Sequence, residues 1–178
     1  MRSPSVRVRA IGWPSLLCAV TISCSCGHVS DRSLRKRFDS HEADFHALRG
    51  MFISDAGIMA ITKKGIRTAT VIVSPRDGLE RVGLSPARYA QYIRLLEALG
   101  LEGGIVRGDN STIWFGAETP SILNGDSTKG YVYSNAELTP CVTDLNSYKP
   151  GPAALNQHGG FVVFSLIKPH WYLYRQAG

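Results

Sequence analysis

The first regular pattern in the chain is a stripe of mostly apolar residues at alternating spacings of three and four. Such spacing places the stripe on one face of an α-helix. Ser30 or Asp31 is suited to cap its start, and the segment 55–57 ends it. The stripe consists of Leu34, Phe38, His41, Phe45, Leu48 and Phe52. The pattern predicts one amphipathic helix, with His41 hydrogen-bonded at the edge of the core.

A second helix is indicated by the residues at its two ends. Ser85 is a good N-cap, Pro86 suits the first helical position, and Gly100 stands just past the end. The apolar face between these signals consists of Tyr89, Ile93, Leu96 and Leu99, with Tyr92 at its flank.

Short apolar and β-branched runs between turn residues predict strands. Residues 58–62 and 68–73 are expected to form one hairpin, and 105–107 and 112–115 another. The other strand candidates are 129–134, 161–167 and 170–174, and the proline-rich residues 138–160 are expected to be loop. The predicted fold class is α+β: two main helices packed on an antiparallel sheet of short strands, in a single domain.

The last two strand candidates are expected to pair with each other around Lys168-Pro169. Residues 161–167 are almost wholly apolar, so without a partner they would expose an edge prone to aggregation. Both faces of 170–174 are expected to lie in the core. We predict that Trp171 is buried and that its indole N–H has a hydrogen-bond partner.

The N-terminal segment has the order of an export signal. Three arginines and no acidic residue precede an apolar stretch over residues 10–22, which is too short to span a bilayer as a permanent helix. We therefore predict a lipoprotein-type signal peptide over 1–23, a tether over 24–30 and the α+β domain over 31–178.

Small and apolar residues lead from this stretch into Cys24, an order that resembles the lipobox of bacterial lipoproteins. Thr21 and Ser23 stand where leucine and glycine or alanine are usual. The resemblance implies that Cys24 receives a diacylglycerol, with Cys26 as the fallback site. Ser25 follows the cysteine in place of the aspartate that retains familiar lipoproteins at the inner membrane, which favours the outer membrane.

The formal net charge of +6 does not indicate a nucleic-acid partner. Three of the 20 basic residues lie in the predicted signal, so the mature chain carries +3. The predicted partners are the membrane, through the N-terminal lipid, and an envelope protein.

One segment has a partial likeness to a zinc-protease helix. That helix needs two histidines four residues apart, whereas His41 and His46 are five apart. The difference turns the second ring roughly 140° away. Asp39, Glu42 and His46 have the spacing of a helical surface site, and a solvated polar face explains them equally well. We predict no metal site and no cofactor.

Two further segments contain residue types that can support chemistry. Residues 125–130 have the composition of a phosphate loop but the wrong order, which favours a turn entering a strand. Cys141 with His158 or His170 would give the nucleophile and base of an acyl-transfer enzyme, without a local signature. A buried, inert Cys141 is the favoured interpretation.

The second helix, the segment 127–134 and the chain end together resemble an uncharacterised group of small bacterial envelope proteins of lipoprotein type. The similar segments are 83–89, 95–101, 104–105, 127–134 and 171–174. The group has no assigned activity, so the resemblance implies one exported domain and no catalytic residues.

The leading hypothesis is a lipid-anchored envelope protein on the periplasmic face that binds another component and is not an enzyme. One alternative is an envelope hydrolase that uses Cys141 or a histidine. The other is a protective, immunity-type partner of a toxin that acts in the periplasm.

Overall fold

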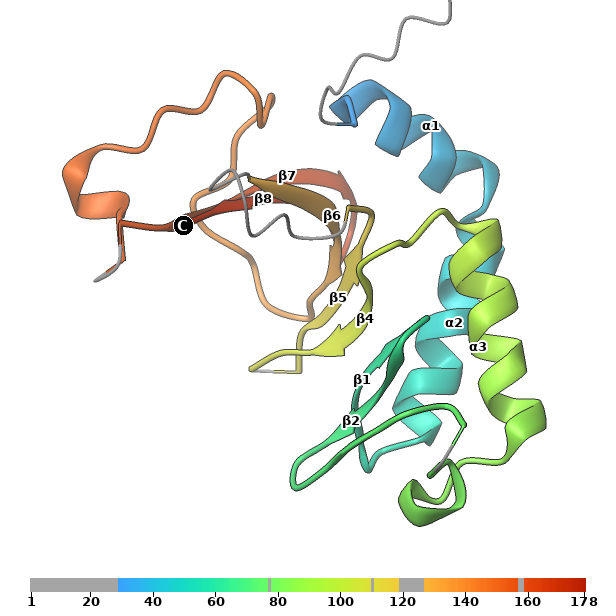
Figure 1. Ribbon diagram of the computed structural model, residues 1–178. Helices are drawn as coiled ribbons and strands as arrows, with labels where there is room; N and C mark the ends of the chain where they lie inside the picture. Colours follow the sequence, from blue (N-terminus) through green and yellow to red (C-terminus); the bar gives the residue numbers. More distant parts are fainter. Residues whose placement is uncertain (1–28, 77, 110, 119–126, 157–158) are drawn as a thin grey trace, which may run out of the picture.

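A computed structural model describes residues 29–76, 78–109, 111–118, 127–156 and 159–178 (Figure 1). These residues form three α-helices and one eight-stranded antiparallel sheet, so the α+β class is confirmed. The finer prediction of two helices on a sheet of short strands was wrong, because the first helix is divided and the strands join into one large sheet.

The helices are α1 (Asp31–Ser40), α2 (Glu42–Ser54) and α3 (Pro86–Ala98). Ser30 caps α1, since its hydroxyl accepts from the Ser33 N–H, and Ser85 caps α3 as expected. His41 ends α1 and begins α2, with φ −131° and ψ 24°. Two single-turn 3₁₀ helices cover Glu80–Val82 and Pro152–Ala154. None of the described helices has the length and apolar character needed to cross a membrane.

The break at His41 leaves the predicted stripe intact. Leu34, Phe38, Phe45, Leu48 and Phe52 all have no exposed surface. The break is held by the His41 ring, whose Nδ1 lies 3.1 Å from Oδ2 of Asp44, and this contact confirms the expected hydrogen-bond partner.

The sheet has the strand order β3-β2-β1-β4-β5-β6-β8-β7, and all its described pairs are antiparallel. The strands are β1 (Ile58–Thr62), β2 (Gly65–Thr68), β3 (Ile72–Val73), β4 (Gly104–Arg107), β5 (Ile113–Gly116), β6 (Thr128–Tyr133), β7 (Phe161–Lys168) and β8 (Trp171–Ala177). The hairpin of β4 and β5 and the strands β6, β7 and β8 lie where the sequence predicts them.

The predicted strand over 68–73 was wrong. The Thr62 hydroxyl accepts from the N–H groups of Lys64 and Gly65, so the chain turns at once and β2 begins at Gly65. Thr68 then makes a second tight turn, because its hydroxyl accepts from the N–H groups of Thr70 and Val71. Two short strands therefore replace one long strand.

One row of side chains across all eight strands forms the floor of the main core. Successive pairs in register join Val73, Ile66, Ile61, Ile105, Phe115, Tyr131, Leu173 and Ser165. Every member of this row is buried. Because side chains alternate between the faces of a strand, this row fixes which face of the sheet meets the helices.

The helices contact this face at successive places along the sheet (Figure 1). The Phe38 ring of α1 lies 5.1 Å from Trp171, and the Phe45 ring of α2 lies 4.6 Å from Tyr131. On α3, the Tyr89 hydroxyl donates to the Thr62 carbonyl of β1 at 3.0 Å. Arg88 of α3 also pairs with Asp55 at the end of α2 at 3.0 Å. The helices thus cover successive parts of the sheet, with α3 beside α2.

The two C-terminal strands complete one edge of the sheet, where β7 is the edge strand and β8 lies between β6 and β7. Trp171, Tyr172, Leu173 and Tyr174 are all buried, so the prediction of core on both faces is confirmed. The prediction of an indole partner was wrong, since the buried Trp171 N–H has no acceptor among the described residues. The indole is packed among rings instead, 5.1 Å from Phe38, 5.3 Å from Phe115 and 5.5 Å from the imidazole of His46.

Candidate functional site

The face of the sheet opposite the helices carries its own continuous row of side chains. Successive pairs in register join Ile72, Arg67, Ala60, Val106, Trp114, Val132, Tyr172 and Leu166, one from each strand. Seven of the eight are apolar or aromatic. An antiparallel sheet with one solvated face usually alternates apolar and polar residues, so an apolar row on a face without helices calls for an explanation.

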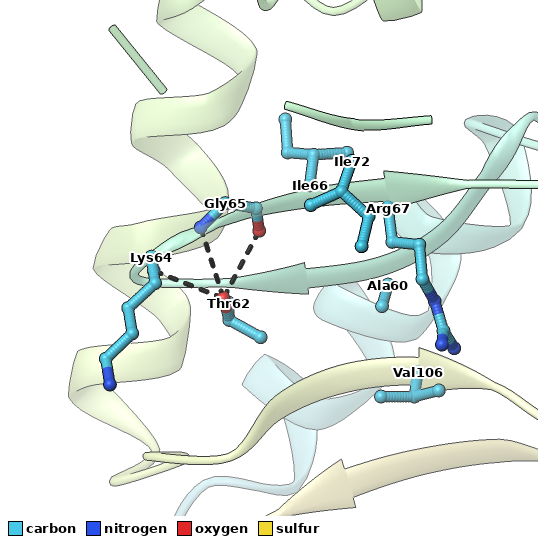
Figure 2. Close-up of a pocket in the computed structure, with 8 residues that line it drawn as sticks. All are labelled: Ala60, Thr62, Lys64, Gly65, Ile66, Arg67, Ile72 and Val106. Carbon is cyan, nitrogen blue, oxygen red and sulfur yellow. Dashed lines mark hydrogen bonds between the residues drawn. The ribbon is translucent and has the colours of Figure 1, made fainter. Parts of the chain in front are cut away.

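The two halves of this row differ in exposure. Toward the C-terminal strands, Val132 and Tyr172 are buried in a second cluster with Phe164 and Tyr174, and Leu138 packs against that cluster. At the other end the row is open, and Ile72 is 79% exposed. A hollow of about 350 Å³ lies there over β1, β2, β3 and β4. We call this hollow the outer groove (Figure 2).

The outer groove has an apolar floor. Its lining residues are Ala60, Thr62, Lys64, Gly65, Ile66, Arg67, Ile72 and Val106. Ala60 and Val106 face each other across β1 and β4, and Figure 2 shows Arg67 on the neighbouring strand above them. The methyl groups of Ala60 and Val106 make no hydrogen bonds to a polar ligand but can pack against an apolar one.

The β1–β2 turn shapes one end of the outer groove. Thr62 holds this turn through its hydroxyl, which also donates to the Gly65 carbonyl at 3.3 Å. A Cβ at Gly65 would lie 2.6 Å from the Val73 carbonyl oxygen, so only glycine lets β3 approach this closely. This close approach places the exposed Ile72 at the rim.

Two cations at the rim have no anionic partner among the described residues. Lys64 and Arg67 are exposed, and neither side chain makes an ion pair or a hydrogen bond there. Their neighbour Lys63 differs, since its ammonium lies 2.9 Å from Oε1 of Glu102. The outer groove therefore joins an apolar floor to positive charge that is not neutralised within the described chain.

The histidine segment of α2 shows no metal geometry. His46 is exposed and its Nε2 lies 4.0 Å from Oε1 of Glu42. Glu42 instead accepts a 2.5 Å hydrogen bond from Lys168, and this bond raises the pKa of the Lys168 ammonium. No group of three candidate ligands comes together in the described residues. In the helical surface site of Asp39, Glu42 and His46, the Glu42 carboxylate is thus paired with the Lys168 ammonium.

Cys141 lies on the surface, so the prediction that it is buried was wrong. Its backbone forms an isolated parallel bridge with Phe164 of β7. His170 has Nδ1 3.1 Å from the Ser134 carbonyl oxygen, and no hydrogen bond joins it to Cys141 in the described part of the chain. His158, Cys24 and Cys26 lie outside the described residues.

The phosphate-loop composition over 125–130 leads into β6, as predicted, with residues 125 and 126 outside the described residues. The Lys129 side chain is buried against Asp31, with Nζ 2.7 Å from Oδ1. Its charge is therefore already paired inside the protein.

The sequence does not point to the outer groove, because its residues come from four strands and none of them stands in a motif. The one available signal is Gly65 between two lysines and a β-branched strand, which predicts the turn but not the hollow. In the comparisons with known proteins, no family model, curated protein or solved structure matches this chain. The resemblance to small envelope proteins stays a prediction.

Proposed function

We propose that this chain is a lipid-anchored protein of the bacterial envelope that acts on the periplasmic side as a non-catalytic binding module. The observation that carries the proposal is the outer groove, an open apolar hollow at one end of the face opposite the helices. Exposed apolar surface of this kind is typical of interaction sites.

The proposed occupant is an extended, apolar segment of a partner protein that carries at least one acidic side chain. Ala60, Val106 and Ile72 would contact its apolar residues. Lys64 and Arg67 would pair with its carboxylate, which supplies the anion missing from the described chain. The groove also lies beside β3, the edge strand of the sheet, where an added segment finds backbone groups for pairing.

The proposed anchor is the lipid on Cys24, with Cys26 as the fallback, and the proposed location is the outer membrane. Support comes from the order of positive residues, apolar stretch and cysteine at the N-terminus. The immunity-type alternative differs from this proposal in the identity of the partner. No contact in the described residues favours the hydrolase alternative.

A photo-crosslinking amino acid at position 72, in the full chain in intact cells, tests the proposed binding. Position 166 is the matched control, since Leu166 stands in the same outer row at the opposite edge and is 50% exposed. We expect a discrete protein adduct from position 72 and none from 166. Mass spectrometry of the adduct should identify a peptide with acidic and apolar residues.

Arg67→Glu tests the charge pairing, because it reverses one rim cation without changing the apolar floor. We expect the adduct at position 72 to fall at least several-fold in this variant. Equal adducts from positions 72 and 166, an adduct with lipid alone, or an adduct unchanged by Arg67→Glu would each overturn the proposed binding mode.

A further inference from the structure

A second hollow, of about 340 Å³, lies on the helix side of the molecule between α2 and the ends of β4 and β6. Its walls include Arg49 and Ile53 of α2, Arg107 at the end of β4, Ser111, Tyr133 at the end of β6, and Asn135. It shares no lining residue with the outer groove.

Arg49 presents an unused guanidinium to this hollow. Its Cζ lies 3.7 Å from the centroid of the Tyr133 ring, which holds the planar group in place by a cation–π contact. Its Nε is buried and has no hydrogen-bond acceptor among the described residues. The Nε itself has no surface for a ligand, so an external acceptor would meet the rest of the guanidinium of this half-buried residue.

Arg107 brings a second positive charge whose partners are all neutral. Its Nη2 donates to the Phe52 carbonyl at 2.8 Å and its Nε donates to the Ile58 carbonyl at 3.3 Å. These bonds fix the guanidinium against the Phe52 ring, 4.8 Å from its centroid. Carbonyl dipoles orient the cation but do not neutralise it. No carboxylate pairs with Arg49 or Arg107 within the described part of the chain.

Neutral donors complete the lining. The Tyr133 hydroxyl donates to Oδ1 of Asn135 at 2.9 Å, which fixes the amide so that its NH₂ group is free to donate. The Ser111 hydroxyl is a further polar group in the wall. Ile53, which is 45% exposed, gives the α2 wall of the hollow an apolar surface.

We infer that this hollow is a binding site for a small oxyanion, a phosphate or carboxylate group on a compact apolar body. The guanidinium groups of Arg49 and Arg107 would donate to the oxyanion, as arginine does to phosphates and carboxylates in general. Asn135 would add a neutral donor, and Ile53 would contact the apolar part of the ligand.

Titration of the full chain with inorganic phosphate, phenyl phosphate and benzoate, followed by amide chemical shifts, tests this inference. We expect saturable shifts around the hollow at concentrations below about 10 mM, with phenyl phosphate binding more tightly than inorganic phosphate. Phenyl phosphate against benzoate then separates the two oxyanions. Benzyl alcohol, which is uncharged, should cause no saturable shift.

Arg49→Gln should weaken phenyl phosphate binding about ten-fold or more, because a charge-assisted hydrogen bond is lost. Arg107→Gln should do the same if it folds, and Arg49→Gln decides the question if it does not. Arg94→Gln is the matched control, since it removes an exposed arginine of α3 that lines neither hollow, and it should leave binding unchanged. The inference would be overturned if none of the three anions caused saturable shifts, or if wild type and Arg49→Gln bound phenyl phosphate with equal affinity.

Discussion

Lys129 and Asp31 form an ion pair almost wholly removed from solvent, with Nζ of Lys129 2.7 Å from Oδ1 of Asp31. The Lys129 side chain is 1% exposed and that of Asp31 is 13% exposed. The second oxygen of Asp31 accepts from the Leu145 N–H at 2.8 Å. One carboxylate therefore joins the start of α1 to β6 and to the loop that precedes β7.

We expect Asp31→Asn to lower the free energy of unfolding by about 3–5 kcal/mol, because it leaves the Lys129 ammonium buried without a counter-charge. Urea unfolding at pH 7 measures the change. The double variant Asp31→Asn, Lys129→Met removes the buried charge as well, so it should recover part of the loss. A double variant less stable than Asp31→Asn alone would contradict this account.

Phe45 and His46 are neighbours in sequence with opposite surroundings. The Phe45 ring is fully buried and contacts Tyr131 and Phe115, whereas the His46 side chain is 50% exposed. Phe45→Ala should destabilise the protein by about 3–5 kcal/mol through loss of buried surface and creation of a cavity. His46→Ala should change stability by no more than about 0.5 kcal/mol. Similar losses from both variants in urea unfolding would mean that the helix face is wrongly assigned.

The helix stripes were predictable because burial follows local periodicity. The cap at Ser85 and the turn at Gly100 (φ +61°) also follow from single residues with strong conformational preferences. The break at His41 was not predictable in this way. The helices on either side of the break, α1 and α2, present their apolar faces to the same core, so the spacing of the stripe continues across the break.

The two hollows and the buried ion pair were beyond local reasoning. Ala60 and Val106 face each other only because β4 pairs with β1, and Arg49 and Arg107 line one hollow only because α2 lies over that part of the sheet. Strand order in a sheet is a long-range property. The sequence pattern specified which residues were apolar but not which strands would be neighbours.

Tyr174 gives the fold an alkaline limit. Burial, with a smaller effect of the Glu118 charge, raises the pKa of the Tyr174 hydroxyl to about 12 from its ordinary value of 10.0. Between those values the unfolded chain loses this proton while the folded protein keeps it. Stability rises with pH only where the unfolded state binds more protons, so here the free energy of unfolding falls as pH rises from about 10 to about 12.

Tyr174→Phe removes this ionisation and should reduce the loss of stability between pH 8 and pH 11.5 by about 2 kcal/mol. Urea unfolding at pH 8 and at pH 11.5 measures it. At pH 8 the Tyr174 hydroxyl is protonated in both the folded and the unfolded chain. The difference in stability between variant and wild type at this pH therefore reports only the loss of the hydroxyl. Burial also raises the pKa of Tyr92 and Tyr131, and these residues leave a remaining alkaline slope. An unchanged slope in Tyr174→Phe would contradict the assignment.

The proposed anchor on Cys24 makes a separate prediction about location. Cys24→Ala should move the protein from the membrane fraction to the soluble or unprocessed fraction, and Cys26→Ala should not. Metabolic labelling with an alkyne fatty acid follows the lipid directly, and we expect the label to vanish in Cys24→Ala alone. Label that persists in Cys24→Ala would transfer the assignment to Cys26 or remove it.

The C-terminal strand β8 is an interior strand, and we predict that the fold fails without it. A chain that ends at Pro169 lacks β8 entirely. Because β8 lies between β6 and β7, its loss separates β7 from the rest of the sheet and removes Trp171 from the contacts with Phe38 and Phe115. The apolar side chains of β7 would then lose most of their cover, which favours aggregation.

A chain that ends at Gln176 is the matched control for this truncation. It keeps every pair in register between β6 and β8, from Thr128 with Gln176 to Tyr133 with Trp171. We expect this control to accumulate and to unfold cooperatively in urea, whereas the chain ending at Pro169 aggregates or is degraded. If the Pro169 chain is instead soluble and unfolds with the cooperativity of the wild type, the sheet is complete without β8 and the packing of Trp171 contributes little to the fold.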